Sequence, residues 1–290
     1  MNLKITRRQF LKTTAATTLA LGGLGAGAAT ATAYDLVDTN VSLGRWPFRR
    51  LPFDDTSDLV AKLRKHGVGQ AWAGSLDAMF GKDIGAVNNW LVRECEKRGR
   101  NIMVPFGTVN LALPNWKAEF QRCCGDYKMP GLRLYPNYHG YKLADPDFSK
   151  LLSLAVEHRM IVQIAVSMED ERTQPPSAQT PHVEVKPLLA MLKSSPIPRV
   201  VLLNWYRAVK PDLVKELAEL GVCFDIATVE NVGGVANLAE QISAERVVFG
   251  SHAPLFYFES AQLKLKESAL DGKTTRAISR ENAVRLLERK

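Results

Sequence analysis

The sequence predicts a single (β/α)8 barrel domain, and three observations support this fold. Eight short apolar runs typical of buried strands recur along the chain, with helical patterns between them. The 257 residues after residue 33 give about 32 per strand and helix, which fits a barrel of roughly 250 residues. A doubly wound open sheet is the alternative, but the Gly-rich phosphate turn that usually follows an early strand of that fold is absent.

The strands are assigned, in chain order, to short runs dominated by apolar residues. Each run is followed by a polar loop, as expected for a strand that leads into a barrel mouth. The eight runs are 35–41, 70–73, 102–109, 131–135, 160–166, 199–203, 222–226 and 247–249.

The helices between the strands are assigned from apolar residues at helical spacing. Several begin at an acid or a Pro, and His66-Gly67 and Leu220-Gly221 are typical helix ends. The expected helices are 58–66, 87–98, 147–158, 183–192, 211–220, 235–242 and 258–270. No repeat or linker divides the chain, and the Pro-rich stretch 174–181 is expected to be a long loop.

The N-terminal segment carries an export signal. The phrase Thr6-Arg7-Arg8-Gln9-Phe10-Leu11-Lys12 resembles the twin-arginine export motif. The uncharged stretch 13–33 is rich in Ala, Thr and Gly, which makes it too polar for a stable membrane span. We therefore expect residues 1–33 to be a cleaved twin-arginine signal and 34–290 to be the barrel, located in the periplasm or cell envelope after contact with the export machinery.

The charge distribution argues against a nucleic-acid partner. The chain has a formal net charge of +8, but four of its bases lie in the first 33 residues, which contain no acid. No dense basic run remains in the rest of the chain. A small-molecule substrate is the expected partner, and assembly into a homo-oligomer is left open.

Polar residues follow the predicted strands, where a barrel carries its chemistry. Arg45 and Arg133 are expected to bind a carboxylate through two parallel hydrogen bonds, which favours a small anionic substrate. The alternative for either Arg is a salt bridge to Asp38 or Asp225. The candidate substrate-binding residues are Asn40, Ser42, Arg45, Arg133, Tyr135, Asn137 and His139.

Three phrases of the chain carry a family resemblance. Leu36-Val37-Asp38-Thr39-Asn40-Val41-Ser42, Val200-Val201-Leu202-Leu203-Asn204 and Val248-Phe249-Gly250-Ser251-His252-Ala253-Pro254 resemble the amidohydrolase-related (amidohydrolase 2) family. That resemblance implies a distorted (β/α)8 barrel with hydrolase or decarboxylase activity. It also implies a metal held by His-x-His after strand 1, by one His after each of strands 5 and 6, and by an Asp after strand 8.

The present chain departs from that metal motif at every position. Asn40 and Ser42 replace the His pair, no His lies at 165–167, Asn204 stands after strand 6, and His252 replaces the Asp. Amide and hydroxyl oxygens are poor zinc ligands, so a standard zinc site is not expected. A divalent metal at a non-standard site is one interpretation, with His252, Glu230 and one of Glu169, Asp170 or Glu171 as ligands. A solvated acidic loop is the other.

The leading functional hypothesis is an exported hydrolase of an ester, lactone or amide-like bond, or a decarboxylase. His252 stands where the family places its catalytic acid, and an imidazole can act as general acid or base without a metal. Asn204 and Glu230 are the other candidate catalytic residues. A ligand-binding barrel of the same family that has lost its activity is the alternative, and an envelope structural component is the third hypothesis.

Overall fold

The computed structural model describes residues 36–290 except 100, 171, 173, 175, 177, 178, 195–198, 289 and 290. The expected export signal at 1–33, the first residue of the expected strand 1, and Glu171 lie outside these residues.

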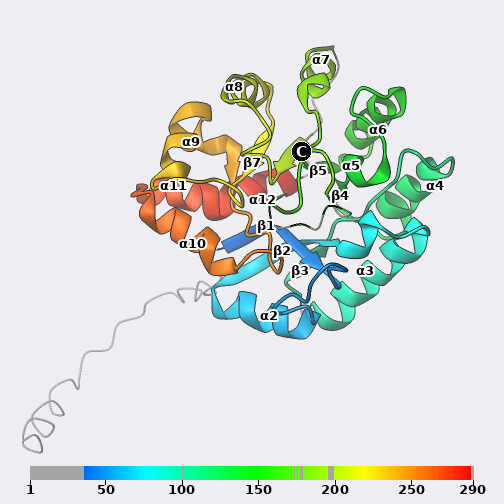
Figure 1. Ribbon diagram of the computed structural model, residues 1–290, viewed down its shortest axis with the longest axis horizontal. Helices are drawn as coiled ribbons and strands as arrows, with labels where there is room; N and C mark the ends of the chain where they lie inside the picture. The colour runs from blue at the N-terminus through cyan, green and yellow to red at the C-terminus, as the bar shows by residue number, and fades with distance from the viewer. Residues whose placement is uncertain are drawn as a thin grey trace, which may run out of the picture. The chain divides into compact units, whose positions relative to one another are not determined.

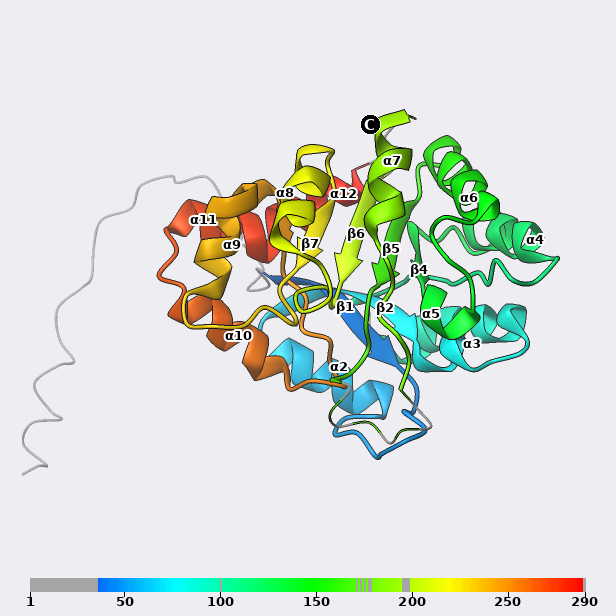
Figure 2. The same cartoon turned by 45° about the horizontal axis from the view of Figure 1, so that its top comes forward.

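In the described residues, eight parallel strands form the centre of the domain, at the places the sequence predicts. They pair in the orders β1-β2-β3 and β4-β5-β6-β7-β8, each strand parallel to its neighbour. Figure 2 shows the arrows of β5, β6 and β7 running in the same direction. The strands are β1 (Leu36–Leu43), β2 (Val68–Ser75), β3 (Met103–Pro105), β4 (Gly131–Leu134), β5 (Ile161–Ala165), β6 (Arg199–Leu203), β7 (Cys223–Asp225) and β8 (Val247–Val248).

The two sheets meet at two seams, which close the barrel. At one seam the Ser42 N–H donates to the Ala253 carbonyl at 2.9 Å, and Val41 bridges Ala253. At the other, Gly107 bridges Leu132. Pro105 has no N–H to donate to a neighbouring strand, and β3 ends there.

Helices surround the strands in a ring (Figure 1). All seven expected helices lie within about three residues of their predicted bounds. Of these, α7 begins three residues late, because the Val183 N–H donates to the Val166 carbonyl at 3.0 Å and keeps that segment extended. The matched helices are α2 (Thr56–Lys65), α3 (Ile84–Arg98), α6 (Pro146–Glu157), α7 (Lys186–Ser194), α8 (Pro211–Glu219), α9 (Gly234–Ile242) and α10 (Phe258–Glu267).

Further helical segments were not expected from the sequence. They are η1 (Leu76–Met79), α4 (Trp116–Gln121) with η2 (Arg122–Asp126), α5 (Pro136–His139), η5 (Ala244–Arg246), α11 (Gly272–Arg276), η6 (Ala277–Glu281) and α12 (Asn282–Leu287). Among the described residues, no helix has the length and apolar character needed to span a membrane.

The hydrophobic core has one layer inside the barrel and a larger one under the helices. Trp72 stacks on Phe106 in the interior, with ring centroids 4.8 Å apart. Ile161, Val201 and Val248 belong to the same interior cluster. Cys95 and Cys223 are free and buried, and they pack as small apolar core residues. This apolar layer leaves the polar strand residues to gather at the other end of the barrel.

Candidate functional site

A layer of buried polar side chains lies at the carboxyl ends of the strands. The fold places them together because parallel barrel strands all end at the same face. Each is at most 2% exposed, so each depends on partners within the protein. The layer consists of Asp38, Asn40, Ser42, Arg133, Gln163, Asn204, Asp225, Ser251 and His252.

Arg133 lies in the barrel interior, and its guanidinium N–H groups donate hydrogen bonds to other residues of the protein. Its Nε donates to Gln163 Oε1 at 2.8 Å, and Nη1 donates to the Val41 carbonyl at 2.7 Å with a longer contact to Ser42 Oγ. Its Nη2 donates to the carbonyls of Thr39 and Trp72, at 3.2 and 2.9 Å. All five N–H groups are therefore directed at protein acceptors, and the guanidinium ties β1, β2 and β5 together.

Asn40, Asn204 and Asp225 form a closed set of hydrogen bonds, the Asn40–Asn204–Asp225 triangle. Asn40 Nδ2 donates to Asn204 Oδ1 at 2.9 Å and to Asp225 Oδ2 at 2.7 Å. The backbone N–H of Asn204 donates to Asp225 Oδ1 at 3.0 Å. The triangle joins the ends of β1, β6 and β7.

A second carboxylate, Asp38, joins β1 to the segment after β8. The Ser251 hydroxyl and backbone N–H donate to its two oxygens at 2.5 and 2.9 Å, and the Asn40 N–H adds a third bond. Burial raises the pKa of Asp38 to about 6, against the opposing effect of these bonds. Burial likewise raises the pKa of Asp225 to about 7.

His252 lies fully buried next to the triangle. Its Nε2 lies 2.7 Å from the Met168 carbonyl, so this nitrogen carries the proton, and the Asn204 amide is 3.4 Å from Nδ1. Burial lowers the pKa of His252 to about 4, so the ring is neutral at pH 7. Asn204 and His252 both have positive φ, of 54° and 59°, a conformation held by the bonds around them.

The tight packing of this layer gives a testable prediction at Gly250. A Cβ there would lie 2.9 Å from Asp225 Oδ2 and 3.0 Å from the Asn40 Cβ, and both side chains are fixed by hydrogen bonds. Gly250→Ala should therefore lower the unfolding free energy by about 1–3 kcal/mol in urea denaturation. Gly272→Ala is the control, since a Cβ there meets nothing closer than 3.5 Å and should not destabilise the fold. Equal effects of the two substitutions would contradict this description of the packing.

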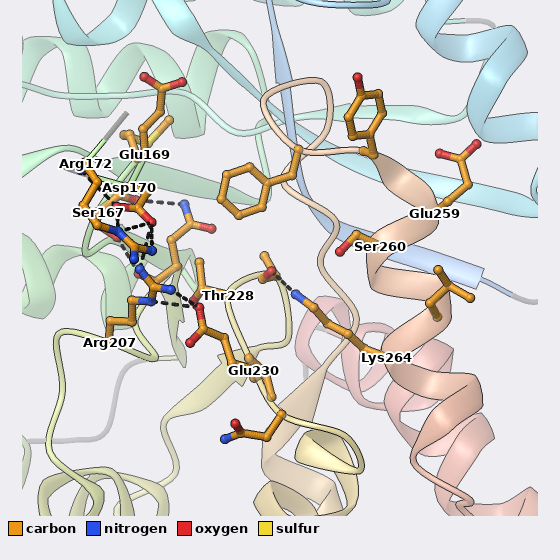
Figure 3. Close-up of a pocket in the computed structure, with 18 of the residues that line it drawn as sticks. Ser167, Glu169, Asp170, Arg172, Arg207, Thr228, Glu230, Glu259, Ser260 and Lys264 are labelled. Carbon is orange, nitrogen blue, oxygen red and sulfur yellow. Dashed lines mark hydrogen bonds and ion pairs between the residues drawn. The ribbon is translucent and has the colours of Figure 1, made fainter. Parts of the chain in front are cut away.

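A cavity of about 1020 Å³ opens above the ends of β5, β6, β7 and β8 (Figure 3). Met168, Val229, Phe256 and Leu263 give it an apolar lining. The remaining lining residues are mostly polar: Ser167, Glu169, Asp170, Arg172, His182, Asn204, Arg207, Ala227, Thr228, Glu230, Asn231, Val232, Tyr257, Glu259, Ser260, Lys264 and Glu267.

Ion pairs hold the loops on one side of the cavity. Arg207 bridges Asp170, at 2.8 Å, and Glu230, at 2.5 Å, and Arg172 also binds Asp170. Figure 3 shows Arg207 between these two acids. Glu169 instead accepts hydrogen bonds from Arg49 and from the Trp46 indole at 3.0 Å, which fixes the loop after β1.

Lys264 is the cavity cation without a carboxylate partner among the described residues. The other Lys and Arg residues of the lining, Arg172 and Arg207, are both ion-paired. The Lys264 Nζ donates to the carbonyls of Ile226 (3.4 Å) and Ala227, which anchors it across the loop after β7 (Figure 3). Burial lowers the pKa of Lys264, opposed by Asp225, Glu230 and Glu267. The arrangement offers a fixed ammonium to a ligand.

The structure divides the predicted catalytic residues between the cavity and the layer beneath it. Asn204 and Glu230 line the cavity. His252 is 0% exposed and contacts three lining residues, Met168, Asn204 and Phe256. Their catalytic roles remain predictions.

The predicted substrate-binding residues do not gather around the cavity. Asn40, Ser42 and Arg133 lie in the buried polar layer. Arg45 is exposed, and the Asn137 amide donates to the Pro181 carbonyl at 3.1 Å. Tyr135 and His139 are buried, with hydrogen bonds to the carbonyls of Ser75 and Ala78. Of the two Arg residues each expected to bind a carboxylate, Arg133 is fully hydrogen-bonded within the barrel and Arg45 is exposed, and neither lines the cavity. Their carboxylate-binding roles stay predictions.

Sequence reasoning missed Lys264 and Arg207. Both follow from tertiary structure: Lys264 lies in a helix, and Arg207 lies in a loop three residues after Asn204. In a barrel sequence only the strand ends predict site residues, so a helix residue that points into the barrel mouth carries no such signal. Its Nζ bonds to backbone carbonyls are visible only in the fold.

The described residues do not fit a divalent metal. They contain no group of three or more His, Cys, Asp or Glu side chains able to hold one. The proposed ligands Glu169, Glu230 and His252 are engaged instead with Arg49, Arg207 and the Met168 carbonyl respectively. Of the two interpretations of the acidic loop, the non-standard metal site is therefore not formed by the described residues, and Glu171 lies outside them.

Comparison with known families gives two matches. The family model described as Amidohydrolase matches residues 45–289. The model of the TAT (twin-arginine translocation) pathway signal sequence matches residues 4–23, where the sequence predicts such a signal. None of the curated proteins compared with the chain matches it.

Solved structures with the same architecture include decarboxylases. A 2,6-dihydroxybenzoate decarboxylase from Rhizobium is 12% identical over 88% of this chain and 98% of its own, with a TM-score of 0.66. A 5-carboxyvanillate decarboxylase from Sphingomonas paucimobilis is 12% identical over 87% and 98%, with a TM-score of 0.67. A dihydroxybenzoic acid decarboxylase from Polaromonas sp. JS666, with bound manganese and 2-nitroresorcinol, is 11% identical over 88% and 97%, with a TM-score of 0.69. These likenesses confirm the barrel fold.

Proposed function

The chain belongs to the amidohydrolase family, and from that premise we propose that it hydrolyses or decarboxylates a small molecule bound in the cavity above β5–β8. Its twin-arginine signal directs it to the periplasm or cell envelope. The observation that carries the proposal is the cavity itself, which lies at the face where barrel enzymes place their chemistry.

The substrate class follows from the lining of the cavity. Met168, Phe256 and Leu263 offer an apolar surface to the body of a substrate. Lys264 offers the one ammonium that no described acid neutralises by an ion pair. We therefore propose a small, partly apolar carboxylic acid, such as an aromatic acid, with its carboxylate on Lys264. The decarboxylases that share this fold act on acids of that kind, as their names state.

The chain's own residues have distinct proposed roles in this site. Asn204 stands at the inner end of the cavity as a polar contact for the substrate, and Glu230 is the candidate proton carrier at its side. His252 acts as a positioning residue, because it holds the Met168 carbonyl and lies against the Asn204 amide without reaching the cavity. No step requires a metal, since the described residues do not fit one.

Lys264→Met should weaken substrate or ligand binding by about 10- to 100-fold, because a charge-assisted hydrogen bond in a partly buried site contributes about 1.5–3 kcal/mol. Binding is measured by calorimetry with 2,6-dihydroxybenzoate and 5-carboxyvanillate. Turnover is followed as CO2 release, and ester hydrolysis as acid release from an aryl ester.

The matched control is Lys266→Met, a neighbouring residue on α10 that is exposed and does not line the cavity. It removes the same charge and should leave binding unchanged. If both variants bind like the wild type, the carboxylate does not lie on Lys264. If neither CO2 nor acid is released from any member of the panel, the proposed reaction is wrong for these substrates.

A ligand-binding barrel without activity is the second candidate, and one observation favours it. Every polar side chain of the Asn40–Asn204–Asp225 triangle is bonded within the protein, which leaves little reactive functionality at the strand ends. Tight binding of an acid without turnover would support this candidate.

A further inference from the structure

The Asn40–Asn204–Asp225 triangle lies at the strand ends of a fold that holds manganese in one solved decarboxylase. We propose that in this protein the triangle replaces a bound divalent cation as the link between strand ends, so that the barrel reaches its full stability without metal. This link between strand ends is structural and does not depend on the reaction proposed above.

The direction of the hydrogen bonds supports this inference. A cation is held by lone pairs that converge on one point. Here the Asn40 amide places N–H protons between the Asn204 and Asp225 oxygens, and the Asn204 backbone N–H occupies the second Asp225 oxygen. Protons with partial positive charge thus take the place that a metal would fill. Binding a metal between these side chains would require all three bonds to break.

On the side of β8, the packing leaves no spare volume beside the triangle. A single Cβ at Gly250 would already lie 2.9 Å from Asp225 Oδ2. Asn40, Asn204 and Asp225 are each at most 2% exposed, so solvent does not complete a coordination shell there. A metal ion therefore has no room on the β8 side of the triangle or between its three side chains.

The bonds next to the triangle extend the same link to the last strand. The backbone N–H of His252 donates to the Asn40 carbonyl at 2.8 Å, and the backbone N–H of Ser251 donates to the Asp38 carboxylate. Four segments of the barrel are thereby joined through neutral donors: β1, β7, and those that follow β6 and β8. The metal motif of the resembling family would join three of these four segments, those at strands 1, 6 and 8, and this chain lacks its imidazole ligands at Asn40, Ser42 and Asn204.

The first test measures thermal unfolding of the purified, exported protein in EDTA and then in excess MnCl2. The unfolding temperature should stay within about 1 °C in both, and plasma mass spectrometry should find no stoichiometric metal. A fall of several degrees in EDTA that Mn²⁺ reverses would overturn the proposal, as would a retained equivalent of metal.

The second test replaces the donor with an acceptor. Asn40→Asp removes both amide protons and sets a second carboxylate against Asp225, so its unfolding temperature should fall by about 5 °C or more. Asn237→Asp on the exposed face of α9 adds the same charge and should shift it by less than about 2 °C. An unchanged Asn40→Asp variant would overturn the proposal. If that variant does not fold, the chelator experiment on the wild type still decides the question.

Discussion

Replacing Arg133 with Met should reduce the unfolding free energy by about 4–5 kcal/mol or prevent folding altogether. The guanidinium is 2% exposed, and the Val41, Thr39 and Trp72 carbonyls that accept its protons lie inside the barrel. Met fills much of the volume but donates nothing, so all three carbonyls lose the guanidinium donors in a site that water does not reach, although the Thr39 carbonyl keeps a hydrogen bond from Gln163 Nε2 at 2.7 Å. Urea denaturation, or soluble yield where the variant does not fold, measures the effect.

Two further variants separate this structural role from the substrate-binding role that the sequence suggests. Arg133→Lys keeps the charge but offers at most three donors. Its unfolding free energy should therefore lie between those of Arg133→Met and the wild type. Arg45→Met removes an exposed guanidinium and should change stability by less than about 0.5 kcal/mol. A folded Arg133→Met protein of normal stability with weakened carboxylate binding would show that Arg133 serves the substrate instead.

Stability should also depend on pH through Asp225, with a loss as pH rises. The carboxyl has a pKa of about 7 in the folded protein against 3.8 ordinarily, so between these values the folded state binds more protons than the unfolded state. The favourable contribution of Asp225 to the unfolding free energy is complete below about pH 4 and is lost as pH rises through 7. It is on the order of 4 kcal/mol in total. Asp38, with a pKa of about 6, acts in the same direction.

The measurement compares unfolding free energies of the wild type and Asp225→Asn between pH 4 and 8. The Asn variant cannot lose this proton, so its stability relative to the wild type should rise across that range. The pH dependence that comes from His252 has the opposite sign. The pKa of His252 is about 4 in the folded protein against 6.5 ordinarily, so as pH falls below 6.5 the wild type loses stability that the His252→Gln variant keeps. Two parallel stability curves for the wild type and Asp225→Asn would show that Asp225 does not titrate as described.

The strands could be predicted because a barrel strand is a local apolar run: each of the eight runs overlaps a strand of the described residues, and only β1 and β2 extend beyond their runs. The helix 183–192 was placed three residues too early, because the pairing of Val183 with Val166 is a contact between segments. The short segments after residue 271 were missed because they are interrupted by a π-helical stretch, η6, and show little continuous periodicity. Family membership and the export signal were both predicted from short phrases and confirmed.

The site was predicted less well than the fold. The sequence identifies which polar residues follow the strands, but it cannot distinguish those bonded to one another from those open to a ligand. Arg133 and Arg45 look alike in the sequence, yet one has five protein acceptors and the other none that the structure describes. Glu169 was expected either to bind metal or to lie in solvent, and it does neither, because it anchors Arg49 and Trp46.

The seam between β1 and the segment after β8 has a consequence for the order of biogenesis. The Thr39 hydroxyl donates to the Phe249 carbonyl across 210 residues of chain, and the Ser42–Ala253 bond spans a similar separation. The first strand therefore has no partner on that side until the last strand has been synthesised, and the polar layer cannot close earlier. Twin-arginine export moves proteins that are already folded, so transport can begin only after nearly the whole chain has left the ribosome. The export route and the late-closing barrel are thus suited to each other.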